Sequence, residues 1–236
     1  MFRAAARSPW AWVLATMVVL ALFPRIDIAA SALFFNSERH IFLLRTHPLG
    51  DFVRKTLPII LFALAAGVAV LGAVARWRGR PVARISPRIA VFVVAALALG
   101  PGLVVNTVLK DNWGRPRPST IAEFHGPNQY VPPLLPSDQC QDNCSFPSGH
   151  AALGFWVVAF AFLAPPRWRR PALAAAVVFG SFVGGVRIAQ GGHFLSDVVF
   201  SGAIVIGLTR WLYVRIVAPY EILTRKNNRA DSPKSP

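Results

Sequence analysis

Residues 89–109 read IAVFVVAALALGPGLVVNTVL, a stretch without a charged side chain, and the next residue is Lys110. An α-helix rises about 1.5 Å per residue, so a run of this length crosses the roughly 30 Å of hydrocarbon in a bilayer. Pro101, between two glycines, would kink the helix, which membranes tolerate when neighbouring helices satisfy the freed carbonyl groups. The stretch therefore predicts a transmembrane helix.

Further apolar runs lie on both sides of it, at residues 10–23, 56–75, 148–164, 172–189 and 197–217. The first run ends at Pro24 and precedes the small residues 30–32, features that also fit a cleaved signal peptide. We favour an uncleaved first helix, because more spans follow and the number of spans is then even. The sequence thus predicts an all-α, polytopic membrane protein with six transmembrane helices in a single domain, residues 1–224, followed by a disordered basic cytoplasmic tail, residues 225–236.

Composition agrees with a membrane protein. Hydrophobic residues make up 54% of the 236 residues and charged residues only 15%, and the mean hydropathy is +0.48. A soluble domain would carry more charge. The net charge of +15 would suit nucleic acid, a membrane surface or an anionic substrate. Because the basic residues lie between apolar spans and form no stripe on a soluble face, we expect anionic lipid and phosphate as partners, and no nucleic acid.

The basic residues in the loops predict the orientation. Most of the 25 lie in the loops after the second and fourth spans and at the two termini: Arg3, Arg7, Arg76, Arg78, Arg80, Arg84, Arg88, Arg167, Arg169, Arg170, Arg225, Lys226, Arg229 and Lys234. This side should be the cytoplasm, with both termini inside.

Loops 24–55, 110–147 and 190–196 then face the opposite, outer side of the membrane. The loop 24–55 is an exception to this charge asymmetry, because it carries Arg39, Arg45, Arg54 and Lys55. Its residues 41–44, IFLL, are expected to form a short amphipathic helix along the interface.

Three polar clusters gather on the predicted outer side. The first, KDNWGRPRP at residues 110–118, concentrates cations where the third span leaves the bilayer. A basic interfacial loop anchored by Trp113 would account for it without any function. The prolines on either side of Arg117, however, stiffen the backbone and suit an arginine that grips phosphate oxygens bidentately, and Lys110 adds a point charge.

The second cluster is Pro147-Ser148-Gly149-His150, at the start of the fourth span. A helix amino terminus offers free N–H groups and a partial positive charge, so it can bind an anion. Ser148 is a good cap and hydrogen-bond donor, Gly149 lets the backbone approach a ligand, and His150 can reach a bound anion. An ordinary serine cap beside an interfacial histidine is the simpler alternative.

The third cluster, RIAQGGHFLSD at residues 187–197, joins the fifth and sixth spans. His193 and Asp197 share one helix face, and an aspartate beside a histidine can fix its tautomer and stabilise the imidazolium. A polar hairpin with a capping pair would be the plain explanation, but a charge such as Arg187 at the edge of the hydrocarbon is costly and usually functional. Together the clusters offer what phosphoryl transfer requires: cations, an in-line nucleophile and an acid.

Cys140 and Cys144 are the two cysteines of the chain, and no His or Cys cluster with metal-ligand spacing accompanies them. If their loop lies outside the cytoplasm, a small disulfide fits the spacing. Two unpaired thiols are the alternative.

The three clusters resemble the motifs of the type 2 phosphatidic acid phosphatase superfamily, which also includes vanadium haloperoxidases. Those motifs are Lys, six residues, Arg-Pro; then Pro-Ser-Gly-His; then Ser-Arg, five residues, His, three residues, Asp. Their order and spacing match across residues 110–197, and the six-span layout fits over most of the chain. One position departs, because Val186 stands where the family has serine, which removes one hydroxyl near the phosphate.

The resemblance implies a helical membrane phosphatase that needs no metal or other cofactor. His193 would attack phosphorus and form a phosphohistidine, oriented by Asp197, while His150 would protonate the leaving alkoxide and then activate water. The phosphate would be held by Lys110, Arg117, Ser148, Gly149 and Arg187. Vanadate should mimic the transition state.

The spans favour a membrane lipid phosphatase over a soluble haloperoxidase. Residues 111–118 and the loop 140–146 look similar to those of bacterial lipid A phosphatases, so lipid A is the expected substrate. Phosphatidylglycerol phosphate, undecaprenyl diphosphate and phosphatidate are alternatives, as is a phosphotransferase that passes phosphate to a second lipid. A non-enzymatic transporter or receptor for phosphorylated lipid is disfavoured, because binding alone does not need two histidines.

Overall fold

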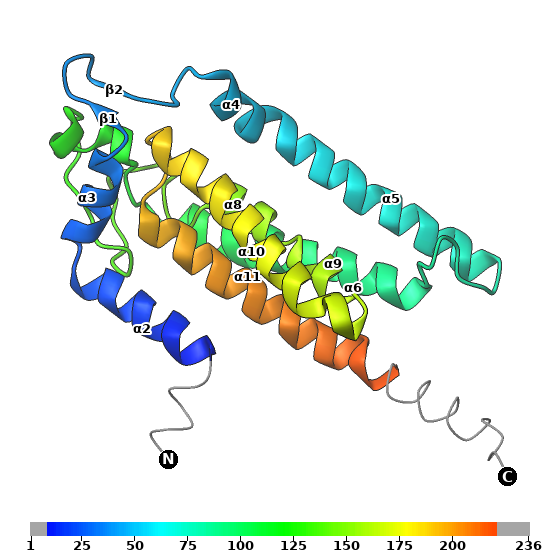
Figure 1. The fold of residues 1–236 in the computed structure, drawn as a ribbon. Helices are drawn as coiled ribbons and strands as arrows, with labels where there is room; N and C mark the ends of the chain where they lie inside the picture. Colours follow the sequence, from blue (N-terminus) through cyan, green and yellow to red (C-terminus); the bar gives the residue numbers. More distant parts are fainter. Residues whose placement is uncertain (1–8, 221–236) are drawn as a thin grey trace, which may run out of the picture.

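The computed structural model describes residues 9–220 (Figure 1). Arg3, Arg7 and the predicted tail, 225–236, lie outside the described residues. Four helical segments are long and apolar enough to cross a membrane: Pro48–Trp77, Pro87–Thr120, Pro166–Ala189 and Leu195–Tyr220. They correspond to the predicted second, third, fifth and sixth spans. The protein is therefore mostly helical, as predicted, with four candidate spans, or five if a bent pair near the amino terminus counts as one.

The long helices begin where the sequence favours a helix start. Helix α5 (Leu57–Trp77), α6 (Pro87–Leu97) and α10 (Pro166–Ala189) each carry a proline in the first turn, where the missing N–H would have no partner anyway. Ser86 caps α6 by accepting a hydrogen bond from the Ile89 N–H at 3.3 Å. The last long helix, α11, covers Leu195–Ile216.

The predicted kink at Pro101 takes the form of a π-helix. Helix α6 continues into the π-helix η2 (Ala98–Lys110) and ends in α7 (Asp111–Trp113). Proline cannot accommodate the usual α-helical bonding in a helix interior, so the ladder widens around it. Within this π-helix the Asn106 side chain donates to the Pro101 carbonyl at 2.7 Å. The sequence predicted the position of this irregularity, and the structure shows its form.

The fourth predicted span, residues 148–164, consists of two short helices, α8 (Gly149–Phe155) and α9 (Val158–Phe162). This apolar helical stretch, Gly149–Phe162, is shorter than each of the four candidate spans. It lies inside the bundle, where the break at Trp156 is fully buried and its Nε1 donates to the Val93 carbonyl at 3.0 Å. Figure 1 shows that it still carries the chain from one end of the bundle to the other, between the end of η2 and the start of α10.

The amino-terminal run forms α2 (Pro9–Leu22), close to the predicted 10–23, but a second helix, α3 (Arg25–Ala32), follows it at an angle of 92°. Pro24 lies at the bend. Helix α3 was not expected from the sequence. It lies at the end of the bundle where α10 ends and α11 begins, and it contributes a fully buried carboxylate, Asp27.

The prediction of an amphipathic helix at residues 41–44 was wrong. Residues Ile41–Phe42 form strand β2, antiparallel to β1 (Phe35–Asn36), with Phe35 opposite Phe42. Phe42 is buried and packs against Phe35 and Phe124, so a hairpin that aligns aromatic rings replaces the interfacial helix. The remaining short elements are α4 (Pro48–Asp51), the π-helix η1 (Phe52–Thr56) leading into α5, and the 3-10 helices η3 (Pro118–Thr120) and η4 (Ala122–Phe124).

Candidate active site

A cavity of about 300 Å³ opens where α10 ends, α8 begins and η2 gives way to the long loop that follows it. Five predicted site residues line it together with three further residues: Lys110, Arg117, His150, Arg187 and His193, joined by Arg54, Lys55 and Asn143. Every charged side chain of this lining is a cation, and no lining residue carries a carboxylate. The cavity is therefore suited to an anion of phosphate size and charge.

His193 is fully buried at the wall of this cavity. Its Nδ1 lies 2.7 Å from the Ser145 carbonyl oxygen, which can only accept a hydrogen bond, so Nδ1 carries the proton. The other ring nitrogen, Nε2, has no partner among the described residues and keeps its lone pair. Burial, and secondarily the Arg187 charge, lower the pKa of His193 to about 3. The imidazole is thus neutral, with a free nitrogen at an anion site.

Asp197 contacts the same segment from the first turn of α11. Its Oδ2 lies 3.6 Å from Nδ1 of His193, beyond hydrogen-bond distance, and it accepts the Phe194 N–H at 2.7 Å and the Ser145 hydroxyl. Ser145 therefore stands between the two predicted partners, since its hydroxyl donates to Asp197 and its carbonyl accepts from His193. Sequence reasoning missed Ser145, because its carbonyl is common to every residue type.

Arg115 is a second missed residue, although it lies within the first motif. It is fully buried and ion-paired with Asp27 of α3 at 2.8 Å and with Asp197. Its remaining donors reach the Val131 carbonyl at 2.7 Å, the Ser196 hydroxyl at 2.9 Å and the Tyr130 hydroxyl at 3.1 Å. An acid beside an apolar run, as at Asp27, was the available signal in the sequence, because buried carboxylates require partners.

Asp27 links the amino-terminal segment to the site. Besides Arg115, it accepts the Ser196 N–H at 2.8 Å, the Ser196 hydroxyl, and the Tyr130 hydroxyl at 3.2 Å. Burial, followed by the Asp27 charge, raises the pKa of Tyr130, which stays a neutral donor. Cleavage at residues 30–32 would remove Asp27 and leave Arg115, Ser196 and Tyr130 each a partner short. These contacts favour the uncleaved first helix.

His150 faces His193's cavity from the first turn of α8. Its Nε2 lies 3.0 Å from the Arg54 carbonyl oxygen and therefore carries the proton, which leaves Nδ1 as the basic nitrogen. Ser148 caps this helix by accepting the Ala151 N–H at 3.3 Å. The local sequence thus fixes a helix amino terminus beside the cavity, with a histidine in its first turn.

Ser148 and Gly149 themselves are not among the residues that line the cavity. Ser148 is fully buried at the cap, and a Cβ at position 149 would lie 2.5 Å from Asn106 Oδ1. A larger residue at position 149 would therefore displace the Asn106 side chain of η2. Val186, at the position of the family's serine, is buried and also absent from the lining.

The cations are held in defined positions. Arg117 donates through Nε and Nη2 to the Asn143 carbonyl, the first at 2.9 Å. Arg187 is 4% exposed and donates through Nη1 to Gln190, while its Nε has no partner among the described residues. That orphaned donor in a buried arginine requires an acceptor, which an anion in the cavity would supply.

Arg54 and Lys55 were noted in the sequence only as exceptions to the charge asymmetry of the loops. The π-helix η1 brings both to the cavity, opposite η2 and α10. Asp51, one turn earlier, pairs with Arg54 at 3.4 Å and with Lys55 at 3.1 Å on the exposed surface. Their place in an outer loop is therefore explained by the anion site.

Comparison with known proteins agrees with this geometry. Residues 89–220 match the PAP2 superfamily. The chain belongs to this superfamily. It is 38% identical over 214 residues to a lipid A 4'-phosphatase of Francisella tularensis subsp. novicida, covering 89% of this chain and 91% of that protein. It is 30% identical over 204 residues to a lipid A 4'-phosphatase of Rhizobium etli, covering 80% and 78% of the two chains.

A third lipid A 4'-phosphatase, from Rhizobium leguminosarum, is 36% identical over 106 residues, or 45% of this chain and 46% of that protein. No solved structure matches the chain. The shared superfamily region begins in α6 and includes α8, α10 and α11, so it contains every residue of the three sequence motifs.

Proposed function

We propose that this PAP2 protein is a lipid phosphatase that hydrolyses a phosphomonoester on a lipid head group, with lipid A as its substrate, through a phosphohistidine at His193. One observation carries the proposal: a neutral histidine, fixed by its Nδ1 hydrogen bond and with no partner on Nε2 among the described residues, lines a cavity whose charged side chains are all cations. Such a nitrogen is a nucleophile, and such a cavity stabilises the charge of a transferring phosphoryl group.

In the first step, His193 Nε2 forms a bond to phosphorus while the bond from phosphorus to the lipid oxygen breaks. A protonated His150 gives its proton to that leaving oxygen. In the second step His150 takes a proton from water, the water oxygen bonds to phosphorus, and the phosphorus–nitrogen bond breaks to release inorganic phosphate. Both steps pass through a phosphoryl group whose equatorial oxygens carry negative charge.

The phosphate ligands in this proposal are Lys110, Arg117 and Arg187, with the Ser148 hydroxyl and the Gly149 N–H at the amino terminus of α8. The cavity lining supports the three cations, and the cap geometry supports the helix terminus as an anion site. Arg54 and Lys55 extend the set beyond the three motifs. Two additional cations suit a substrate with more than one negative group.

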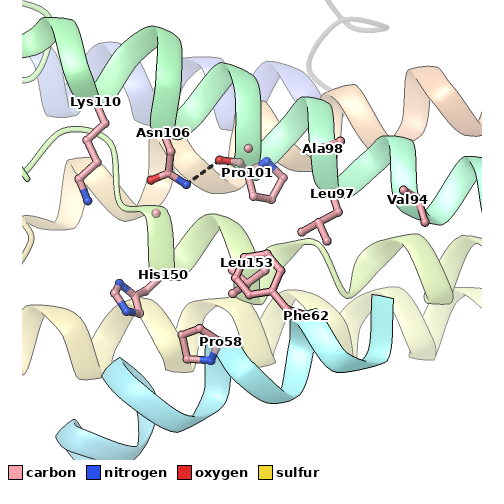
Figure 2. Close-up of a pocket in the computed structure, with 12 residues that line it drawn as sticks. Pro58, Phe62, Val94, Leu97, Ala98, Pro101, Asn106, Lys110, His150 and Leu153 are labelled. Atoms are coloured by element: carbon pink, nitrogen blue, oxygen red, sulfur yellow. Dashed lines mark hydrogen bonds between the residues drawn. The ribbon is translucent and has the colours of Figure 1, made fainter. Parts of the chain in front are cut away.

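An apolar groove beside the cavity supports a lipid as the substrate. Figure 2 shows this groove, of about 380 Å³, between α5 on one side and α6 with η2 on the other. Its walls are largely apolar, with Phe62, Leu97 and Leu153 among them, and Lys110 and His150 line both the groove and the cavity. An acyl chain in the groove would therefore place the phosphorylated head group between the two histidines.

Lipid A is favoured over the other lipids by the relatives, since the Francisella and Rhizobium proteins are lipid A 4'-phosphatases. Phosphatidylglycerol phosphate, undecaprenyl diphosphate and phosphatidate are the competing substrates. A phosphotransferase would share the first step and deliver the phosphoryl group to a second lipid in place of water.

The proposed setting is the bacterial inner membrane, with the cavity facing the periplasm and both termini in the cytoplasm. The single domain then crosses the membrane six times, with α2 as the first pass and the buried α8–α9 segment as the fourth. Two observations support this topology: α8–α9 joins opposite ends of the bundle, and α10 begins with three arginines in its first turns, Arg167, Arg169 and Arg170.

The test uses purified protein in detergent with a chelator and a panel of lipid A, phosphatidylglycerol phosphate, undecaprenyl diphosphate and phosphatidate. We expect phosphate release, fastest from lipid A, inhibition by vanadate, and loss of turnover in His193→Ala. Mass spectrometry of the lipid products separates hydrolysis from transfer to a second lipid. Turnover that survives in His193→Ala would contradict the nucleophile, and vanadate-insensitive binding without any release would identify a lipid-binding protein.

His150→Ala provides the matched test of the acid. Removing a general acid costs about 10²–10⁴-fold, but only when the leaving group needs a proton. The first step, followed as the burst of released alcohol, should therefore slow much more with a lipid phosphate than with an aryl phosphate, whose leaving group is a weak base. Equal losses on both substrates would contradict the proposed role.

A further inference from the structure

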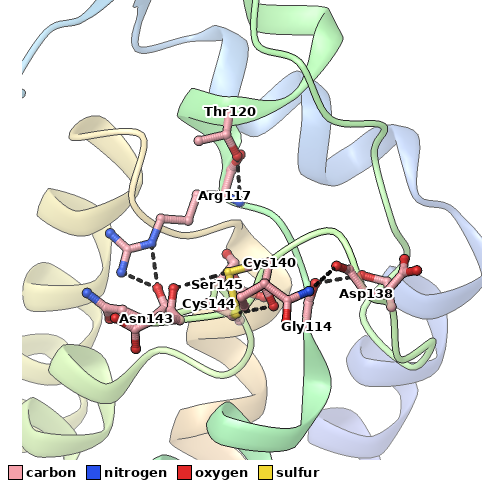
Figure 3. The surroundings of a disulfide bond; sticks show 12 residues. Gly114, Arg117, Thr120, Asp138, Cys140, Asn143, Cys144 and Ser145 are labelled. Atoms are coloured by element: carbon pink, nitrogen blue, oxygen red, sulfur yellow. Dashed lines mark hydrogen bonds between the residues drawn. A yellow bond between two sulfur atoms is a disulfide. The ribbon is translucent and has the colours of Figure 1, made fainter.

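The loop between η2 and α8 contributes Arg117 and Asn143 to the cavity, and part of it lacks secondary structure. Ser137 is tied by its N–H to the Trp113 carbonyl at 2.9 Å, and Ser145 by its N–H to the Arg115 carbonyl at 2.8 Å. Between them, no backbone N–H of residues 138–144 donates to another backbone carbonyl in the described structure. Within this stretch the Cys140–Cys144 disulfide closes a small ring, with 5.6 Å between the two Cα atoms (Figure 3).

The ring presents one carbonyl to a phosphate-binding cation. Figure 3 shows the Arg117 guanidinium directed at the Asn143 carbonyl, which accepts from both Nε and Nη2. Asn143 also lines the cavity, and its φ of 49° lies in the left-handed region that L-residues seldom adopt. The backbone conformation of Asn143, inside the Cys140–Cys144 ring, therefore sets the direction of this carbonyl.

The residue directly after the ring presents a second carbonyl to the nucleophile. Ser145 follows Cys144, and its carbonyl accepts the Nδ1 proton of His193 at 2.7 Å. Thus Arg117 is positioned by a carbonyl within the five-residue ring, and His193 by the carbonyl of the residue directly after it. Removing the disulfide frees the segment that carries both acceptors.

We propose that the Cys140–Cys144 ring is a positioning element for catalysis, so that the enzyme is fully active only with this disulfide formed. Cys140 and Cys144 touch neither substrate nor nucleophile and act through the carbonyls of Asn143 and Ser145. The inference rests on the proposed function of His193 and Arg117. It also ties activity to an oxidising compartment, which is where an outward-facing loop would lie.

The experiment follows phosphate release from lipid A by the full-length protein while a phosphine reductant opens the disulfide, with alkylation and mass spectrometry reporting the fraction of reduced ring. We expect kcat to fall in step with that fraction, by on the order of 10²-fold at full reduction, because small misplacements of reacting groups cost about that much. Reoxidation should restore the rate. The Cys140→Ser/Cys144→Ser variant should be equally slow and indifferent to the reductant, which controls for other effects of the phosphine.

Each outcome has a distinct meaning. An unchanged kcat with the ring fully reduced overturns the positioning role and leaves the phosphatase intact. Irreversible loss with aggregation on size exclusion also overturns it, because the disulfide would then serve stability alone. Absence of turnover in the oxidised wild-type protein, by contrast, overturns the proposed function itself.

Discussion

At the residue scale, the state of His193 is decided by its surroundings. Its carbonyl partner fixes the tautomer, and burial keeps the ring neutral. The motif spacing predicts His193 as the nucleophile and Asp197 as its partner, but it could not reveal that the nearest acceptor of the His193 ring is a serine carbonyl. Every residue type has the same backbone carbonyl, so the sequence does not show which carbonyl accepts a hydrogen bond from His193.

The lowered pKa of His193 predicts a pH dependence. The folded protein binds this proton more weakly than the unfolded chain, so the free energy of unfolding should decrease as pH falls from 6.5 towards about 3. Carbon NMR of histidine-labelled protein should therefore show no titration of the His193 ring between pH 8 and pH 5, with added imidazole as the reference. The His193→Ala variant identifies that signal. Titration of the assigned ring near pH 6.5 would contradict the burial argument.

At the element scale, four of the six apolar runs in the sequence correspond to candidate spans in the structure. Pro101 marked the one of these four that contains a π-helix. The boundaries of the fourth span and the hairpin at 35–42 were not predictable, because both depend on packing between distant segments. Trp156 breaks the helix where its side chain reaches the Val93 carbonyl, and Phe42 enters a strand where Phe35 and Phe124 meet it. The hydrophobic periodicity of a segment shows which of its faces is apolar, but it does not show which other segment packs against that face.

Close packing of α10 on α8 gives a prediction with an internal control. A Cβ at Gly180 would lie 2.3 Å from the Phe155 ring, whereas a Cβ at Gly185, in the same helix, meets nothing within 4 Å. Gly180→Ala should lower the free energy of unfolding by about 1–3 kcal/mol through overpacking, and Gly185→Ala should leave it equal or slightly higher because alanine favours helix. Unfolding in mixed detergent micelles measures both. Equal effects would contradict this packing.

At the scale of the whole molecule, Arg115 joins three distant parts of the chain: α3 through Asp27, the long loop through Tyr130, and α11 through Asp197. Replacing it by methionine would leave two buried carboxylates without their cation, which lowers the free energy of unfolding by about 3–5 kcal/mol. Arg115→Met should therefore unfold far more readily in mixed micelles than Arg78→Met, a change at an exposed arginine at the end of α5. Similar midpoints for the two variants would contradict the network.

The link between Asp27 and Ser196 spans 169 positions of sequence. During synthesis Asp27 leaves the ribosome early, while Arg115 and then Asp197 follow much later. Its carboxylate therefore lacks its partners Arg115 and Ser196 until almost the whole chain has been synthesised. Every nascent chain that ends before Asp197 lacks a completed ion-pair network, so we expect it to be inactive. Most of the chain is thus inserted into the membrane before the protein can become active.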